Sequence, residues 1–435
     1  MGGRICDQSF TNLFCWQDFY HNHWTVLEDR LVIRCLIYGE HRTGYMILPD
    51  IRSERLSALL AQLQEDQKEP LTLINLSEEE VDWLQAHYPG QWGIDHNRDY
   101  DDYLYETARF QSFNGKKLAA KRNHVNKFQK TYEYSYEPLS AKWFDDCLRL
   151  DQEWQSIRGE DSPQAEAERT VIKKAFDNME ALGILGGVLL SSGKPIAFTY
   201  GSPLNEETFC IHIEKADTRY EGVYPMMAQL FAQHLPSQYR YLDREEDLGL
   251  SGLRKSKESY HPVRMEKKHI AIMMDKTQLE MVDVWTRCFE DEPAFVHSFL
   301  ARHYLRENAF LHTESDRVVA TCFLIVCETE IGRIGYLYAI ATLPEYRHRG
   351  IAEQLVRQAI ERCRELHLSA VALIPASQHL ADYYRRIGFS SEAVPIRFLS
   401  SLVLGTGNTA EDNALLMPLD PALNIPPILQ ARPIV

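Results

Sequence analysis

The sequence predicts an α/β protein in which mixed sheets are distributed over three successive units. Short runs of β-branched and aromatic residues alternate with segments whose apolar residues recur at helical spacing, over the first ~110 residues and again over 140–270. A third pattern of this kind begins near Ala271, and 435 residues are enough for two to four domains. We therefore predict domains at 1–114, 115–270 and 271–435.

The composition is that of a globular protein. Apolar residues make up 45% of the chain and charged residues 25%, which excludes a disordered or collagen-like chain. The net charge of −15 argues against a nucleic-acid binder that uses its whole surface, although it allows a local basic patch. The longest apolar run, Val318–Cys327, is about half of the ~20 residues that a membrane-spanning helix needs. With no signal-peptide pattern at the N-terminus, we expect a cytoplasmic protein without a membrane span.

The cysteines predict reduced thiols and no metal centre. Their number is odd, they are dispersed, and no two of them have the spacing of a paired metal ligand set. They are Cys6, Cys15, Cys35, Cys147, Cys210, Cys288, Cys322, Cys327 and Cys363.

In the first unit, Leu31–Tyr38 and Leu71–Leu76 are predicted strands, and Ile51–Gln64 is a predicted helix. Ser77 and Glu80 have the spacing of a capping box, which opens a helix that extends to about His87.

A basic helix is predicted over 115–130. It carries six cations and no acid, and these are Lys116, Lys117, Lys121, Arg122, Lys127 and Lys130. Such a stripe is either a solvated helix face or an anion site for phosphate or a nucleic-acid backbone.

The second unit continues with further predicted helices and strands. The helices are 140–154, 166–182 and 222–233, and the strands are 187–190, 195–200, 207–214 and 240–242. The segment from Gly187 to Lys194 is not a phosphate loop, because its spacing is one residue too long and Pro195 replaces the Ser or Thr.

The most specific motif lies in the third unit, in residues 337–352. A strand ends at Pro344, and a loop rich in Arg and Gly then opens a helix over 353–366. Such a loop directs backbone N–H groups and a helix N-terminus at a pyrophosphate. Gly350 allows the backbone to approach the phosphates closely, and Arg347 and Arg349 can add charge-assisted hydrogen bonds.

This loop, Arg347 to Ala352, resembles the Gln/Arg-x-x-Gly-x-Gly/Ala motif of the GNAT acyltransferase superfamily, and 383–389 resembles that family's Phe-Tyr-x-x-x-Gly-Phe ending. The resemblance implies a GNAT-like fold, acetyl-CoA or another acyl-CoA as donor, an amine acceptor and no metal cofactor. It implies Tyr384 as the general acid that reprotonates the CoA thiolate. The implied donor-binding residues are Ile340, Ala341, Thr342, Arg347, His348, Arg349, Gly350, Ile351 and Ala352.

The general base of this site stays open. Relatives that use a carboxylate on the following strand have an acid where this chain has Ala372. The alternatives are a water-relayed route or one of the residues Glu330, Glu345, Tyr336 and Tyr338.

Segments of the first 270 residues resemble the C-terminal catalytic domain of bacterial phosphatidylglycerol lysyltransferases, and more closely its soluble relatives. The segments are 9–16, 115–128, 212–225, 244–257 and 259–262. The resemblance implies two tandem GNAT-like subdomains, as in Fem-type aminoacyltransferases, and aminoacyl transfer from a charged tRNA. The whole chain would then contain three GNAT-like units.

Cations and carboxylates in this half are the candidates for substrate binding, because a tRNA end needs cations and an α-amino group needs carboxylates. They are Lys121, Arg122, Lys127, Glu214, Arg244, Glu245, Asp247, Arg254 and Lys257. With no membrane-spanning part attached, a soluble or peripheral acceptor is expected rather than a lipid. Relatives carry further residues before Phe10, so a shortened first subdomain is also expected.

Two alternatives to a catalytic N-terminal half follow. It could be a recognition module that delivers a peptide, tRNA or small molecule to the C-terminal site. Both sites could also have decayed into a binding protein, which the intact loop and Tyr384 argue against. After Phe389 the chain is rich in proline, and we expect irregular structure there.

Overall fold

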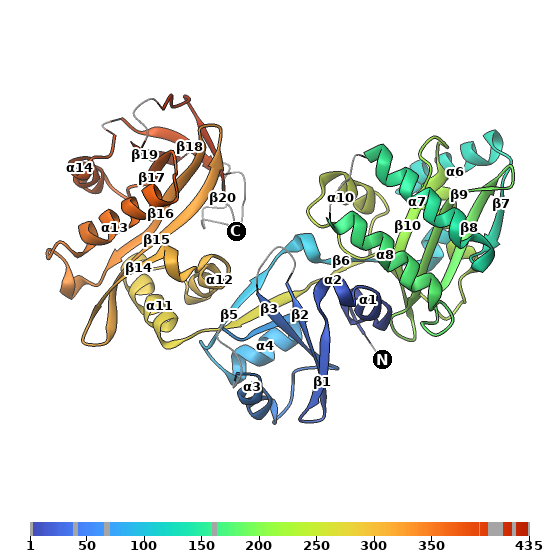
Figure 1. Cartoon of the computed structure of the whole chain (residues 1–435), viewed down its shortest axis with the longest axis horizontal. Helices are drawn as coiled ribbons and strands as arrows, with labels where there is room; N and C mark the ends of the chain where they lie inside the picture. Colours follow the sequence, from blue (N-terminus) through green and yellow to red (C-terminus); the bar gives the residue numbers. More distant parts are fainter. Residues whose placement is uncertain are drawn as a thin grey trace. The chain divides into compact units, whose positions relative to one another are not determined.

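The computed structural model describes residues 3–37, 42–64, 70–158, 163–390, 392–398, 412–419 and 423–433. It divides into two compact units (Figure 1). Unit 1 comprises Met1–Leu84 and His96–Ile270, and unit 2 comprises Gln85–Asp95 and Ala271–Val435. Both contain mixed sheets covered by helices, so the predicted α/β class is confirmed.

The first sheet has the strand order β1-β2-β3-β4-β13-β5. Its strands are β1 (His23–Leu27), β2 (Arg30–Leu36), β3 (Thr43–Leu48), β4 (Thr72–Leu76), β5 (Trp92–His96) and β13 (His269–Met273). The chain passes from one unit to the other within α4 (Glu78–His87), β5 and β13. The helices of this part are α1 (Phe10–Cys15), α2 (Gln17–Tyr20), α3 (Leu56–Gln64) and α4 (Glu78–His87).

Helix α4 begins and ends where the sequence predicts. The Ser77 backbone N–H donates to Glu80 Oε2 at 2.9 Å, and the Glu80 N–H donates to Ser77 Oγ at 3.2 Å. The predicted capping box is therefore confirmed, and it satisfies two N–H groups that the helix start would leave free.

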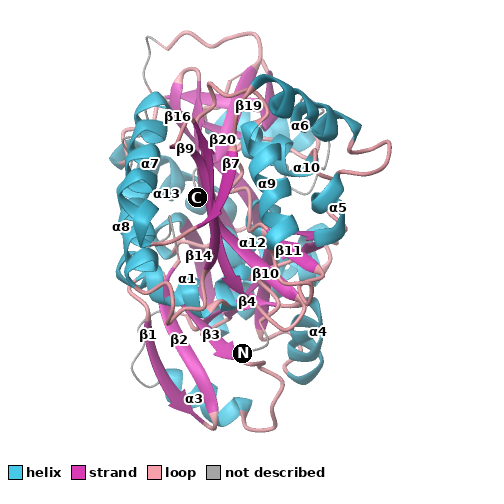
Figure 2. Ribbon diagram, turned by 90° about the vertical axis from the view of Figure 1, so that its right-hand side faces the viewer, coloured by secondary structure: helices cyan, strands magenta, loops and turns pink. Residues whose placement is uncertain are grey.

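The second sheet of unit 1 has the order β12-β6-β11-β10-β9-β8-β7. Its strands are β6 (Asp102–Glu106), β7 (Ser135–Pro138), β8 (Leu185–Ser191), β9 (Lys194–Pro203), β10 (Thr208–Ala216), β11 (Tyr241–Asp243) and β12 (Arg264–Glu266). The accompanying helices are α5 (Thr107–Ser112), α6 (Ala119–Thr131), α7 (Phe144–Arg158), α8 (Pro163–Asp177), α9 (Val223–His234) and α10 (Ser251–Glu258). Figure 2 shows α7 and α8 on one side of this sheet and α6 and α9 on the other, over two separate apolar clusters.

Several helices differ in their bounds from the predicted ones. Helix α3 begins at Leu56 rather than at 51, α7 spans Phe144–Arg158 rather than 140–154, and α8 spans Pro163–Asp177 rather than 166–182. Helix α6 starts at Ala119 rather than at 115, because Gly115 has a φ of 90° and a turn precedes the helix. Strand β6 precedes residue 115 and belongs to the second sheet. The domain division at 114/115 stays a prediction.

Unit 2 contains one sheet of order β14-β15-β16-β17-β19-β18-β20, and β15 also pairs with β20. Its strands are β14 (Ala309–Glu314), β15 (Arg317–Thr329), β16 (Gly332–Thr342), β17 (Ala370–Leu373), β18 (Val394–Phe398), β19 (Asp412–Pro418) and β20 (Leu429–Pro433). Helices α11 (Lys276–Phe289) and α12 (Pro293–His303) pack on one face, and α13 (Ile351–Glu365) and α14 (Gln378–Ile387) pack on the other.

The expectation of irregular structure after Phe389 is wrong for the described residues. Strands β18, β19 and β20 are part of the sheet, and their residues Ile396, Leu416 and Leu429 are fully buried in its core. Three prolines lie within these strands, at positions 395, 418 and 433. Partner strands supply the burial that outweighs the low strand propensity of proline. Among the described residues, no helix is long and apolar enough to cross a membrane.

Candidate functional site

In unit 2, strands β16 and β17 separate partway along their length. They pair in parallel only from Ile334↔Ala370 to Tyr336↔Ala372, whereas β16 continues to Thr342 and β17 ends at Leu373. Over the described residues, the second half of β16 therefore keeps one edge of its backbone N–H and C=O groups unpaired with β17. Such an edge can accept an extended ligand as an additional strand.

A β-bulge in β16 lies where the two strands separate. Thr321 pairs with Ala341 and Phe323 with Tyr338, so β16 has two residues where β15 has one. Ala339 in this bulge has a φ of 45°, which is unusual for a residue that is not glycine. Bulges bend a strand and are common beside active sites. The run from Leu337 to Thr342 contains no glycine or other local signal that would predict this bulge.

The loop that follows β16 places positive-φ residues before helix α13. His348 has a φ of 62° and Gly350 a φ of 78°, and Gly350 is the N-cap without a side-chain cap hydrogen bond. A Cβ added at Gly350 would meet nothing within 4 Å, so the space beside the start of the helix is open. Glycine is favoured at this position because of its positive φ and not because of crowding. An uncapped helix N-terminus of this kind can bind an anion.

The two predicted arginines of this loop are exposed and hydrogen-bonded to its backbone. Arg347 Nε donates to Thr342 O at 3.0 Å, and Arg349 Nη2 donates to Glu345 O at 3.2 Å. Both guanidinium groups are thus held at the backbone of this loop, and Arg349 Nη1 also lies 3.6 Å from Glu314 Oε1. Ile351 is buried and Ala352 is partly buried in the first turn of α13.

An open depression of about 530 Å³ begins at Gly350 and continues along α13. It is lined by Gly350, Glu353, Gln354, Arg357, Gln358 and Glu361. Because two of these residues are acids and one is an arginine, its charge does not by itself favour an anion.

Tyr384 lies on α14, on the same face of the sheet as α13, and is 7% exposed. Burial raises the pKa of its hydroxyl above the ordinary tyrosine value. Ile340 and Thr342 are partly buried and Ala341 is buried, all in the second half of β16. Thr342 Oγ1 is buried without a hydrogen-bond partner among the described residues.

The structure separates the candidates for the general base. Glu330 lies in the turn at the opposite end of β16, where its carboxylate accepts from Gln430 N. Glu345 is exposed and paired with Arg287 at 3.1 Å. Tyr336 and Tyr338 pack in the apolar cluster beside α11 and α12, and burial raises the pKa of Tyr338 to about 12. The lowered pKa of Glu345 and the raised pKa values of Tyr336 and Tyr338 disfavour these three groups as bases near neutral pH.

In unit 1, three predicted residues form a second cluster. Arg244 Nη2 donates to both carboxylate oxygens of Glu214, at 3.1 and 3.0 Å, and both side chains are 13% exposed. The Arg244 guanidinium lies 4.9 Å from the centre of the Tyr260 ring, and Lys121 Nζ lies 3.7 Å from the same ring. Tyr260 was not among the predicted site residues.

Burial and the neighbouring cation Arg244 lower the pKa of Lys121 to about 8, although Glu214 opposes this shift. Arg244 Nη1 is buried without a hydrogen-bond partner in the described part of the chain. A lysine with a lowered pKa, next to an arginine whose buried N–H group has no acceptor, is typical of a binding or catalytic site.

The other predicted cations and acids of unit 1 have structural contacts. Asp247 is buried and accepts from Arg254 Nε at 2.9 Å and from Gly249 N at 2.9 Å. Lys257 donates to the carbonyl oxygens of residues 244–246. These three residues, Asp247, Arg254 and Lys257, hold the loop after β11 in place.

Arg122 and Lys127 of the basic helix α6 make local contacts. Arg122 Nη1 donates to Phe113 O at 2.7 Å, beyond the last turn of α5, and Lys127 forms an exposed ion pair with Glu221. The structure therefore brings Lys121 into the cluster with Glu214 and Arg244 but keeps Arg122 and Lys127 outside it.

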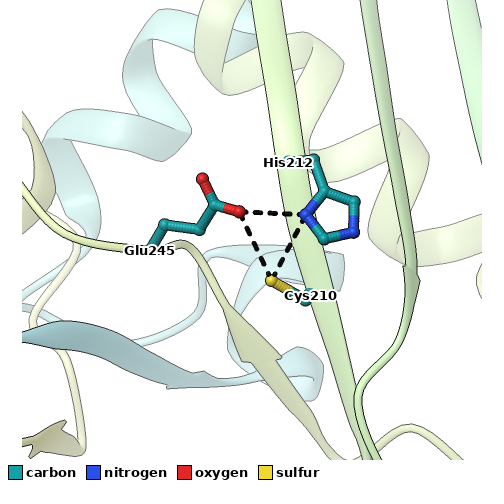
Figure 3. A group of neighbouring side chains, drawn as sticks. All are labelled: Cys210, His212 and Glu245. Carbon is teal, nitrogen blue, oxygen red and sulfur yellow. Dashed lines mark hydrogen bonds and ion pairs between the residues drawn. The ribbon is translucent and has the colours of Figure 1, made fainter. Parts of the chain in front are cut away.

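Glu245 takes part in a further group, shown in Figure 3. His212 Nδ1 lies 2.9 Å from Glu245 Oε1, and Cys210 Sγ lies 3.6 Å from His212 Nδ1 and 3.7 Å from Glu245 Oε1. Burial, with the carboxylates of Asp243 and Glu245, raises the pKa of the Cys210 thiol. This group was not predicted, because Cys210 and His212 lie two positions apart on one strand and Glu245 lies 33 positions after His212.

Comparison with known proteins places both halves among acyltransferase-type domains. Residues 2–272 match the family model of the phosphatidylglycerol lysyltransferase C-terminal domain, and residues 270–391 match that of an acetyltransferase (GNAT) domain. Both resemblances predicted from the motifs are thereby confirmed.

Two relatives are similar over much of the chain. The crystal structure of a conserved protein of unknown function from Bacteroides thetaiotaomicron is 37% identical, with a TM-score of 0.59, and the match covers 63% of this chain and 94% of that chain. An uncharacterized protein of Mycoplasmoides gallisepticum is 25% identical over 237 residues, which are 51% of this chain and 71% of the relative.

Proposed function

The chain belongs to the phosphatidylglycerol lysyltransferase C-terminal family through residues 2–272, and from this premise we propose that it is a two-part acyltransferase. Unit 2 transfers an acetyl or another acyl group from acyl-CoA to an amine. Unit 1 carries a second site, of the aminoacyltransferase type. Since acyl-CoA and charged tRNA are both found in the cytoplasm, we place the reaction there.

The observation that supports acyl-CoA as donor is the separation of β16 from β17 directly before the loop 347–352. The unpaired edge of β16 at Ile340–Thr342 binds the amide groups of the pantetheine arm as an additional strand. The pyrophosphate then lies on the N–H groups at the start of α13, between Arg347 and Arg349.

In the reaction that we propose, the acceptor amine attacks the thioester carbonyl carbon, and the carbon–sulfur bond breaks. Tyr384 donates its proton to the departing CoA thiolate. Like any tyrosine hydroxyl, that of Tyr384 is protonated at neutral pH and therefore has a proton to donate. Glu330 lies at the opposite end of β16, and the pKa shifts of Glu345, Tyr336 and Tyr338 disfavour them as bases. We therefore propose that the amine proton leaves through water.

The test of donor binding is calorimetry of the full chain with acetyl-CoA. Arg349→Glu reverses the charge beside the loop and is expected to weaken binding by about tenfold or more, since a charge-assisted contact contributes about 1.5–3 kcal/mol. Arg364→Glu is the matched control. Arg364 is an exposed arginine in the last turn of α13, the helix that begins just after the loop. Equal binding by the wild type and both variants would refute this donor site.

A second activity is favoured by the cluster of Lys121, Glu214 and Arg244. The free Nη1 of Arg244 binds a carboxylate or phosphate of the substrate, and Glu214 holds the guanidinium in position. A lysine with a pKa of about 8 is partly neutral near physiological pH, so it can exchange a proton with an amine or hydroxyl acceptor.

Aminoacyl transfer is tested with charged tRNA that carries a labelled amino acid. The wild-type chain is expected to transfer the label to an acceptor, and Arg244→Lys is expected to lose this transfer. Lys142→Met serves as a control, because Lys142 is exposed and lies outside both the cluster and the basic helix α6. Binding of tRNA without any transfer would support a non-catalytic recognition module instead.

A further inference from the structure

In unit 1, the side chains of Cys210, His212 and Glu245 bring one sulfur, one nitrogen and one oxygen atom within 4.8 Å of one another (Figure 3). We propose that these three side chains bind one divalent cation of the zinc class. Sulfur, imidazole nitrogen and carboxylate oxygen are the three donor types that zinc takes in proteins. The inference is independent of the acyltransferase chemistry proposed above.

The distances between the three donor atoms are close to those of a tetrahedral site. Zinc bond lengths imply separations of about 3.6 Å from sulfur to nitrogen, 3.6 Å from sulfur to oxygen and 3.4 Å from nitrogen to oxygen. The observed separations are 3.6, 3.7 and 2.9 Å. Only the last is short, since His212 and Glu245 are joined by a hydrogen bond, and a small rotation of the Glu245 side chain corrects it.

The backbone presents His212 to this group through a β-bulge. Ile211 pairs with Gly201 and Ile213 with Tyr200, so His212 is the extra residue of β10. A Cβ at Gly201 would lie 1.9 Å from Cys210 O, and only glycine permits this approach of β9 to the bulged strand. A bulge re-aims a side chain, which here directs the imidazole toward Cys210 and Glu245.

Outer partners hold two of the ligands. Ser202 Oγ lies 2.8 Å from His212 Nε2, so it can accept the Nε2 proton and leave the Nδ1 lone pair for the metal. Asn12 Nδ2 donates to Glu245 Oε1 at 2.9 Å, which orients the carboxylate. Hydrogen bonds of this kind are typical around metal ligands.

One buried carboxyl group, that of Asp243, lies beside the group. Asp243 pairs with Cys210 across the parallel strands β10 and β11, which places both side chains on the same face of the sheet. Asp243 is fully buried, and its Oδ2 has no hydrogen-bond partner within the described residues. A divalent cation would compensate this carboxylate together with the ligand Glu245.

A second group of three possible metal ligands in unit 1 already contains a cation. Cys6, Asp102 and Glu246 also offer three donor atoms, but Lys268 Nζ lies 3.2 Å from the sulfur, 2.8 Å from Asp102 Oδ1 and 3.3 Å from Glu246 Oε2. The ammonium group therefore already occupies the position of a cation. The group of Cys210 contains no such ammonium among the contacts of the described chain.

The experiment is a titration of the metal-free full chain with Co²⁺, followed by displacement with Zn²⁺. We expect one Co²⁺ per chain, with a thiolate-to-cobalt charge-transfer absorption that Zn²⁺ abolishes. Cys210→Ser is expected to lose this absorption, and the matched variant Cys6→Ser is expected to keep it. Ser202→Ala should keep the absorption but weaken affinity by about 10–100-fold, as outer-partner substitutions do.

If Cys210→Ser does not fold, Glu245→Gln decides, because it keeps the side-chain volume at a position that is 22% exposed. It is expected to weaken cobalt binding at least as strongly as Ser202→Ala. The proposal is overturned if the wild type binds neither metal, if the absorption persists in Cys210→Ser, or if Cys6→Ser alone abolishes it.

Discussion

Lys121 is the residue whose titration reports most directly on the cluster in unit 1. Its folded pKa of about 8 is below the ordinary lysine value of 10.5, so folding penalises the charged form. The penalty is fully present below pH 8 and disappears as the pH rises from about 8 to 10.5.

We therefore expect the free energy of unfolding of the wild type to rise relative to that of Lys121→Met across this pH range. Urea denaturation at several pH values measures the difference. Lys121→Arg cannot titrate there, so it should lack this dependence. A constant difference between the wild type and Lys121→Met would contradict the account of Lys121.

The pair of Glu214 and Arg244 makes a second prediction at the residue scale. Removing one partner of a buried ion pair leaves an uncompensated charge, so Glu214→Gln is expected to cost about 3 kcal/mol of unfolding free energy. Replacing both residues, as Glu214→Leu with Arg244→Met, should cost less than the single change. Urea denaturation of the variants gives both values, with Glu221→Gln in an exposed ion pair as the control.

At the scale of the element, strand β16 depends on the bulge at Ala339. Its φ of 45° is acceptable to glycine and disfavoured for β-branched residues. Ala339→Val should therefore lower the thermal midpoint and weaken acetyl-CoA binding, while Ala339→Gly should preserve both. Differential scanning calorimetry and ligand titration test this, and equal behaviour of the two variants would rule out a conformational role for the bulge.

The elements that the sequence predicts well are those with strong local signals. Helix α4 has its capping box, and the loop 347–352 has its motif. The bulges at Ala339 and His212 carry no local signal, because they arise from the register between two strands. Strands β18, β19 and β20 were missed because proline is a poor local indicator when neighbouring strands supply the burial.

At the scale of the whole molecule, the average charge concealed the local arrangement. A net charge of −15 argues against anion binding, yet the helix α6 carries cations that include Lys121 of the candidate site. Of nine predicted residues in unit 1, the structure brings Lys121, Glu214 and Arg244 together. The remaining six hold loops, form surface pairs or belong to the group of Cys210, because sequence distance does not reveal which side chains meet.

The central claim is that unit 2 of this family member transfers an acyl group from acyl-CoA with Tyr384 as the acid. Its most direct test measures CoA release from acetyl-CoA by the full chain in the presence of a panel of amines, for the wild type and Tyr384→Phe. The account predicts that the variant still binds acetyl-CoA but releases CoA about 10²–10⁴-fold more slowly. Equal rates for the two proteins, or no binding of acetyl-CoA by the wild type, would contradict it.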